Sequence, residues 1–300
     1  MPLDVGGIFN PSLVGTVTSA LPVGSFRARL SWTSNTQITL GAYGGNAVEV
    51  NGQSVSVQSG IICATTQDTI QFDATDSGFT PSASTFYYVY LSNASVGFLP
   101  SSLALSVQAP TLVNGVYYLG STGDAASWRF VGAVYLDAAV HFTDTDAARN
   151  VVNYYNRLRA RLLANPGYTD DNAQTGVILN SAVFAPINGG TGDFVEYCSL
   201  GEDALDLRMQ LTQVTALLNS ATWGIGDDST TTCAVAAKGE SNVGTDQVSC
   251  GYSVLHSAGR HKLSMLGYTN ATNITWAADD VRRGGASDPR QTFLVGTCYK

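Results

Sequence analysis

Residues 142–167 read FTDTDAARNVVNYYNRLRARLLANPG, and this stretch separates two long segments of similar composition. Residues 1–140 contain three arginines and no lysine, whereas the stretch itself contains four arginines, at Arg149, Arg157, Arg159 and Arg161. The formal charge is −4 over residues 1–140, +2 over 141–165 and −6 over 166–300, within a total of −8. The connector therefore differs chemically from both segments that it joins.

Two periodicities fit this connector. A helical spacing of i, i+3 or i+4, and i+7 is followed by Val151, Tyr154, Tyr155, Leu158 and Leu162. Asp144 or Asp146 could cap the start of such a helix, and the Asn-Pro-Gly at the end would stop it. We favour the helix, and three copies with outward arginines could form a short coiled coil at a symmetry axis. Val152, Tyr154 and Leu158 also fit a strand period, so residues 146–164 remain open between helix and strand.

The composition indicates a β-rich protein with a largely neutral surface. Three hundred residues correspond to about two average domains, and 44% hydrophobic residues suffice for a core in each. Only 13% of residues are charged, against about a quarter in ordinary soluble domains, and there are 31 glycines. Such a surface relies on hydroxyl and amide groups, as is typical of extracellular and virion proteins.

Charge and targeting signals narrow the expected partners. A net charge of −8 gives no electrostatic attraction to nucleic acid. The first residues lack the charged and apolar regions of a signal peptide, and no run of 18 apolar residues predicts a membrane span. A protein of this texture without an export signal fits release by cell lysis, as happens for components of virions.

The first half predicts an arm followed by a β module. Residues 1–25 contain a glycine pair, Pro11 and Pro22 without a clear period, which predicts an extended arm that docks on a partner. Residues 26–142 alternate short apolar runs with turn residues, the pattern of antiparallel strands. Asn51-Gly52 lies between AVEV and QSVSV and predicts a hairpin. FYYVYL at 86–91 is apolar on both faces and predicts a central strand.

The second half predicts another β module, over residues 168–300, after a connector over residues 143–167. Its eight short runs are typical of a jelly-roll sandwich: FVEYCSL, LDLRMQLTQVTALL, TWGIG, TTCAVAA, QVSCGYSVL, HKLSMLGY, NITWAA and QTFLVGTC. The second run is long enough for a helix, but its alternating leucines favour a strand. The predicted fold is all-β, with two antiparallel β-sandwich or jelly-roll-like modules joined by a short helix or strand connector.

Several segments, in this order, resemble a family of structural and fibre proteins from tailed-phage virions. In the first half they are STFYYVYLSN (84–93), STGDAASWRFVGAVYLD (121–137) and RNVVNYYNR (149–157), and they are similar to the strands and loops of a β module in that family. In the second half GDFVEYCSL (192–200), TWGIGDDST (222–230) and SAGRHKLSMLGYTNATNITWAA (257–278) look like the jelly-roll-like module that often follows. The resemblance implies a structural role without a common catalytic centre.

This chain departs from the family pattern at two places. The family's tight "FNRR" junction is replaced by residues 158–165, and its aromatic approach to "LLG" is replaced by Gly259-Arg260-His261-Lys262 before Met265-Leu266-Gly267. The resemblance therefore carries over no catalytic, cofactor-binding, metal-binding or receptor-binding residue.

The sequence offers few residues for catalysis. It lacks G-x-S-x-G, H-E-x-x-H, G-x-x-x-x-G-K-[ST] and G-x-G-x-x-G. The histidines are His141, His256 and His261, and the last two are five residues apart, which on a strand places them on opposite faces and disfavours a metal site. Paired acids for glycoside cleavage are Glu202, Asp203 and Asp206, or Asp227-Asp228, or Asp279-Asp280. Solvated turns or weak calcium sites are the commoner reading of adjacent acids.

The cysteines number five, so at least one thiol cannot pair within the chain. They are Cys63, Cys198, Cys233, Cys250 and Cys298, and none has C-x-x-C spacing. We interpret them as small buried hydrophobic residues, with a Cys233–Cys250 bridge left open.

Together these features predict a non-enzymatic virion protein without a cofactor. The expected molecule is a homotrimeric fibre or spike on the tail or head, attached to other virion proteins through its N-terminal arm and touching host surface polysaccharide. A capsid decoration or adaptor subunit without receptor binding is the alternative within the same class. A carbohydrate-active enzyme of the host envelope and a secreted lectin are the alternatives from other classes.

Overall fold

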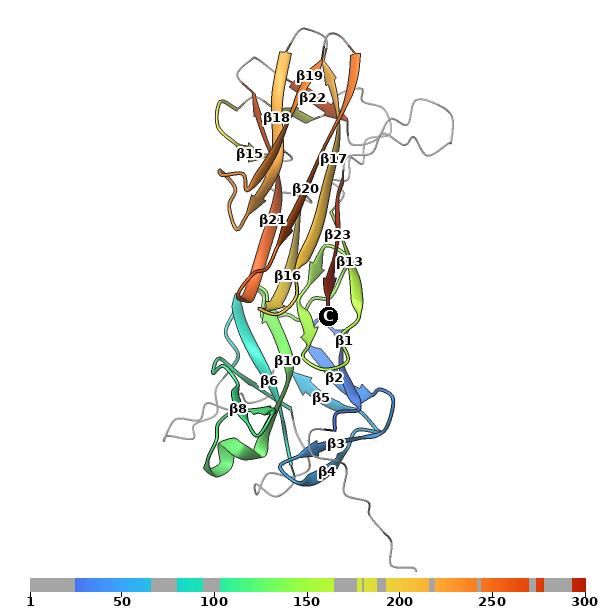
Figure 1. Cartoon of the computed structure of the whole chain (residues 1–300), viewed down its shortest axis with the longest axis vertical. Coiled ribbons are helices and arrows are strands. Elements are labelled where there is room, and N and C mark those ends of the chain that lie inside the picture. Colours follow the sequence, from blue (N-terminus) through green and yellow to red (C-terminus); the bar gives the residue numbers. More distant parts are fainter. Residues whose placement is uncertain are drawn as a thin grey trace, which may run out of the picture.

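The computed structural model is an elongated all-β protein in which two β modules lie end to end (Figure 1). It describes residues 25–65, 80–93, 103–164, 177–179, 181–187, 193–215, 219–241, 244–269, 274–277 and 293–300. Within these residues there is no α-helix, and strands account for most of the chain. The predicted all-β class is confirmed.

The first module consists of two facing sheets and a hairpin. One sheet has the order β1-β2-β5, from β1 (Ala28–Ser34), β2 (Gln37–Ala42) and β5 (Ile61–Ala64). The hairpin pairs β3 (Ala47–Val50) with β4 (Gln53–Ser56). The other sheet has the order β7-β6-β10-β9-β8, with β12 also paired to β10. Its strands are β6 (Thr85–Ser92), β7 (Leu103–Ser106), β8 (Thr111–Val113), β9 (Val116–Tyr118), β10 (Trp128–Leu136) and β12 (Val151–Asn153). A 3₁₀ turn, η3 (Gly123–Ser127), leads into β10.

The turn chemistry explains how these strands pair. Asn51 and Gly52 have positive φ angles of 48° and 78°, so the β3–β4 hairpin forms as predicted. Asn114 and Gly115 make the corresponding turn between β8 and β9. Strand β6 pairs on both sides, with β7 and β10, which confirms that the aromatic run at 86–91 is a central strand.

A buried arginine fastens the first module internally. Arg129 on β10 is fully buried, and its guanidinium lies beside the stacked rings of Phe26 and Tyr155, at 5.1 and 4.9 Å from their centroids. Its guanidinium forms an ion pair with Glu49 at 3.2 Å and donates to the backbone oxygen of Ser25 at 3.0 Å. One cation therefore holds the start of the described chain, the β3–β4 hairpin and the central sheet together.

The second module is a sandwich of two sheets. The first has the order β11-β16-β21-β18-β19, with β15 beside β21, and the second has the order β13-β23-β17-β22-β14, with β20 beside β17. The strands are β11 (Ala148–Arg149), β13 (Arg159–Ala164), β14 (Val177–Leu179), β15 (Ala185–Pro186), β16 (Phe194–Leu200), β17 (Leu205–Thr215), β18 (Asn219–Asp227), β19 (Val235–Ser241), β20 (Gly244–Val254), β21 (Ala258–Thr269), β22 (Ile274–Ala277) and β23 (Phe293–Tyr299).

All eight runs predicted for this half form strands. The ambiguous second run is β17, whose Leu205, Leu207, Met209 and Leu211 are buried in the core between the sheets while the intervening side chains face outward. The alternating apolar residues therefore predicted the strand correctly, because only a strand places every second residue on the same face.

The predicted connector helix is wrong. Residues 148–164 form β11, β12 and β13, and these short strands join different sheets. In β13 the burial alternates, with Ala160, Leu162 and Ala164 inside the second module. The helical spacing arose because Val151 packs in the core of the first module and Leu162 in that of the second, while Leu158 between them is 40% exposed. A coiled coil of these helices at a symmetry axis is excluded with the helix itself.

Candidate functional site

The joint between the modules is one continuous backbone segment of six residues. Ala148 and Arg149 in β11 pair in parallel with β16 of the second module, opposite Glu196 and Tyr197. Val151 to Asn153 in β12 pair with β10 of the first module. Between them, the carbonyl oxygen of Asn150 accepts from the Tyr135 amide at 3.0 Å and from the Cys198 thiol at 3.7 Å. The modules are thus joined by shared sheet hydrogen bonds, not by a free linker.

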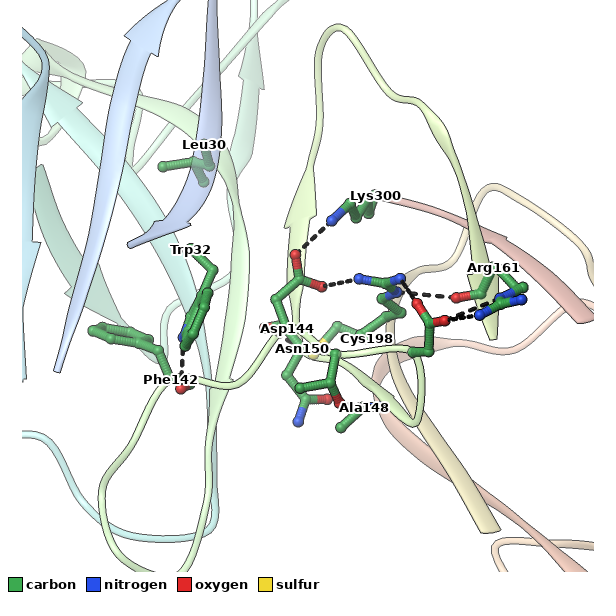
Figure 2. Close-up of polar contacts among 12 residues, drawn as sticks. Leu30, Trp32, Phe142, Asp144, Ala148, Asn150, Arg161, Cys198 and Lys300 are labelled. Carbon is green, nitrogen blue, oxygen red and sulfur yellow. Dashed lines mark hydrogen bonds and ion pairs between the residues drawn. The ribbon is translucent and has the colours of Figure 1, made fainter. Parts of the chain in front are cut away.

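Ion pairs surround this shared segment. Asp144 accepts from Lys300 Nζ at 2.6 Å and from Arg149 at 3.4 Å, and only 8% of its side chain is exposed (Figure 2). Asp146 binds both Arg149 and Arg161. The hydrogen bond from Arg161 is the main reason that the pKa of Asp146 is lowered from its ordinary value. Side chains from both ends of the connector therefore converge on two carboxylates.

The remaining two connector arginines also have partners within the chain. Arg157 binds Glu202 and Asp203, which lie in the turn between β16 and β17, and its guanidinium lies over the ring of Tyr154. Arg159 lies over the ring of Tyr299 and donates to its hydroxyl at 3.1 Å. Arg149, Arg157 and Arg161 thus bind carboxylates around the joint, whereas Arg159 links β13 to β23 within the second module.

Apolar contacts complete the joint. Cys198 packs with Ala133 and Val152 of the first module, and Leu200 packs against the aromatic cluster of Tyr90, Trp128 and Phe130. A cavity of about 10 Å³ lies beside Cys198 and Cys298, which is about the size of a single water. This space is far too small for a sugar or any other organic substrate.

A second polar constellation lies at the end of β18, close to the joint. Asp227 accepts from Tyr252 at 2.6 Å and faces His256 Nε2 at 2.8 Å. Nδ1 of the same ring lies 2.5 Å from the Tyr197 hydroxyl. We call Asp227, Asp228, His256, His261, Tyr197 and Tyr252 the histidine cluster.

The two imidazole rings of the histidine cluster are stacked. Their centroids are 4.0 Å apart and their planes differ by 8°. His261 Nδ1 lies 2.7 Å from Asp228, and its Nε2 lies 3.0 Å from the carbonyl oxygen of Ser257. Asp228 also accepts from the Lys262 amide at 2.7 Å. Each aspartate of the adjacent pair therefore holds one histidine.

The expectation that His256 and His261 lie on opposite faces is wrong. His256 does not belong to a strand but to the turn of residues 255–257 between β20 and β21, so the alternation of a strand does not apply to it. Gly259, with a φ of 151°, bends the chain just beyond this turn. The chain reverses at this turn, and His256 therefore lies over His261, the first buried residue of β21.

In the histidine cluster Tyr197 is only 3% exposed and the two histidines are buried, whereas the side chains of Asp227 and Asp228 are 21% and 48% exposed. Asp227 and Asp228 are occupied by tyrosine, histidine and backbone donors. The first predicted acid group is occupied as well, because Glu202 and Asp203 share Arg157 while Asp206 is exposed on β17. Asp279-Asp280 lies outside the described residues.

The part of the chain that the structure describes contains no group of three or more histidines, cysteines or acids able to hold a metal ion. All five cysteines are unbonded, so the Cys233–Cys250 bridge is not formed. Four are buried, in agreement with their interpretation as hydrophobic residues, and burial raises the pKa of Cys63 and of Cys298 to about 12. These thiols stay protonated and act as packing groups.

Comparisons with known proteins add no family. No protein-family model matches the chain, and no curated protein matches it. None of the described segments forms a helix of the length and apolarity needed to cross a bilayer.

Proposed function

We propose that this protein is a structural subunit of a phage-type virion, assembled as a homotrimeric fibre or spike that contacts the host surface. The observation that carries the proposal is the joint, in which six consecutive residues belong to sheets of both modules. Such a joint transmits force along the molecule without bending at a linker. An enzyme of two modules more often places its substrate in a cleft between them, whereas here that space is filled.

The outer face of β17 and β20 in the second module is exposed to solvent, and we assign the contact between subunits to this bare face. In the first sheet of the second module Ser264 and Leu266 point away from the core and are nevertheless buried. In the second sheet Asp206 and Arg208, which point outward from β17, are exposed. The exposed outward residues of β20 are small: Ser249, Gly251 and Ser253. Small outward residues allow the sheet of another copy to approach closely.

The oligomeric state tests this proposal directly. We expect the full chain, of 31.5 kDa, to elute with three times that mass in light scattering at micromolar concentration. Ser253→Arg is expected to lower the trimer fraction, because the long cation would stand on the bare face. It should spare the fold, since position 253 pairs across the strands with Asp206. Ser56→Arg, on the exposed face of β4, is the matched control. A wild-type monomer would overturn the proposal of a trimer.

Host contact needs a separate measurement. The trimer is expected to bind polysaccharide from the host envelope without releasing product from it, and Asp227→Asn is expected to leave that binding intact. Virion association without polysaccharide binding would identify a decoration subunit instead. Product release that Asp227→Asn or Asp279→Asn abolishes would identify a carbohydrate-active enzyme.

A further inference from the structure

The proposed structural role gives no function to the stacked pair of His256 and His261, and the charge that this pair carries is the starting point of a further inference. Two imidazolium rings stacked face to face repel each other, and both rings here are buried. The hydrogen-bond partners determine how many protons the pair holds. The ionisable and polar groups around the pair come from β16, from β18 and the residue after it, from β20 and from the turn itself. They are Tyr197, Asp227, Asp228, Tyr252 and the Ser257 carbonyl.

His261 faces an acceptor at each ring nitrogen. Nδ1 lies 2.7 Å from a carboxylate oxygen of Asp228, and Nε2 lies 3.0 Å from the Ser257 carbonyl oxygen. A carbonyl oxygen and a carboxylate only accept hydrogen bonds, so both contacts require a hydrogen on the ring. This geometry makes His261 the charged member of the pair.

His256 faces one acceptor and one donor. Its Nε2 lies 2.8 Å from both carboxylate oxygens of Asp227 and therefore carries a hydrogen. Its Nδ1 lies 2.5 Å from the Tyr197 hydroxyl. Tyr197 is only 3% exposed, so its hydroxyl hydrogen needs an acceptor within the protein, and His256 Nδ1 is the acceptor that the described residues offer it. A nitrogen that accepts carries no hydrogen, and His256 is therefore the neutral member.

We propose that the stacked pair is a one-proton latch, which holds the turn between β20 and β21 closed only while one of the two rings is charged. A second proton, on His256 Nδ1, would break the bond from Tyr197 and place two cations face to face. Loss of the proton from His261 would leave either Asp228 or the Ser257 carbonyl without its hydrogen. The latch is thus expected to open in both directions of pH.

Opening would be felt at the joint between the modules. The carbonyl oxygen of His256 accepts from Ser199 Oγ at 3.3 Å, and Ser199 also receives the amide of Gly201 at 3.0 Å. Leu200 lies between these two residues and packs on the aromatic cluster of the first module. Leu255, at the tip of the turn, is already 60% exposed. Release of the turn would therefore loosen the second module where it docks on the first.

The sign of the pH dependence follows from proton counting. In the unfolded chain each histidine takes up its second ring proton, the one that charges it, near pH 6.5. The unfolded pair therefore carries two positive charges well below this pH and none well above it. The closed latch carries one positive charge both below and above this pH. Opening therefore takes up a proton in acid and releases one in alkali, and the opening constant rises by at most about tenfold per pH unit in either direction.

The first experiment is imidazole ¹⁵N spectroscopy of the full wild-type chain near pH 6.5. We expect His256 to show hydrogen on Nε2 alone and His261 to show hydrogen on both nitrogens. Two neutral rings, two charged rings, or the same titration for both rings as for His141 would overturn the proposal. His141 is a suitable internal reference, because its ring is 39% exposed and lies 3.9 Å from a carboxylate oxygen of Asp137.

The second experiment is hydrogen exchange of the turn amides between pH 5 and pH 8. His256→Gln is expected to abolish the acid rise in opening, because an amide offers the same donor and acceptor but takes up no proton. His141→Gln is the matched control and should retain both rises. An acid rise that persists unchanged in folded His256→Gln would contradict the latch. If that variant does not fold, the spectrum of the wild type still decides the proton count.

Discussion

At the scale of single residues, Arg129 shows how a buried cation can hold together a module that has few charged side chains. Its side chain is fully buried, and its guanidinium reaches Glu49, the Ser25 carbonyl and two aromatic rings. Replacing a buried ion pair with apolar groups can be neutral, but removing one member leaves the other charge in the interior. The loss of Arg129 therefore costs more free energy than the ion pair itself contributes, because it leaves the charge of Glu49 buried without this cation.

Arg129→Met is expected to destabilise the first module by about 3–5 kcal/mol, because Glu49 would keep its buried charge without this cation. Urea unfolding followed by tryptophan fluorescence measures the loss. Arg27→Met, at an exposed position just before β1, is the control and should change stability by less than about 0.5 kcal/mol. The double variant Arg129→Met with Glu49→Gln should recover part of the loss, and no recovery would show that packing, not charge, dominates.

At the scale of elements, the hairpins depend on backbone conformations that only a few residues adopt readily. Gly52 has a φ of 78° in the β3–β4 turn, where a Cβ would meet no atom within 4 Å. The constraint is thus conformational and not steric crowding by neighbours. Gly132 on β10 illustrates the other case, because a Cβ there would lie 2.2 Å from the Val152 carbonyl oxygen of β12.

Gly52→Ala is expected to lower the free energy of unfolding by about 1–2 kcal/mol, the cost of a left-handed conformation for a residue with a Cβ. Gly41→Ala is the matched control, because position 41 has equally open surroundings and no positive φ. That variant should be neutral or slightly stabilising, since alanine reduces the freedom of the unfolded chain. Equal losses in both variants, measured by thermal unfolding, would contradict this explanation.

At the scale of the whole molecule, the connector arginines determine how firmly the modules are joined. Arg157 binds Glu202 and Asp203 across the joint, yet Glu202 and Asp203 are 42% and 35% exposed. Solvent screens such pairs, so each contributes little to the stability of the protein. Their effect should appear in the local opening of the joint.

Arg157→Met is expected to weaken the joint by about 1 kcal/mol and leave both modules folded. Hydrogen exchange at Tyr154 and Leu158 should then accelerate about fivefold, because their amides bond to Val131 and Lys300 beside the lost pairs. The exposed Arg27→Met variant should leave these rates unchanged. If global unfolding shifts by several kcal/mol while these two amides do not respond, Arg157 stabilises a module and not the joint.

The sequence by itself determined the strands and the tightest turns. Alternating leucines predicted β17 against a competing helix, and Asn51-Gly52 predicted its hairpin, because side-chain period and positive φ are local properties. The same local reasoning predicted a helix in the connector and was wrong there. Val151 and Leu162 of the connector satisfy a helical spacing, but they pack in different modules.

Only the tertiary structure decided which polar groups meet. Tyr197, Asp227 and His256 come from two strands and a turn, and nothing in their spacing brings them together before the sandwich is assembled. Arg157 reaches Glu202 and Asp203 across more than forty residues for the same reason. Contacts of this kind depend on strand order and on where a turn reverses the chain, and these are set by burial of the whole core.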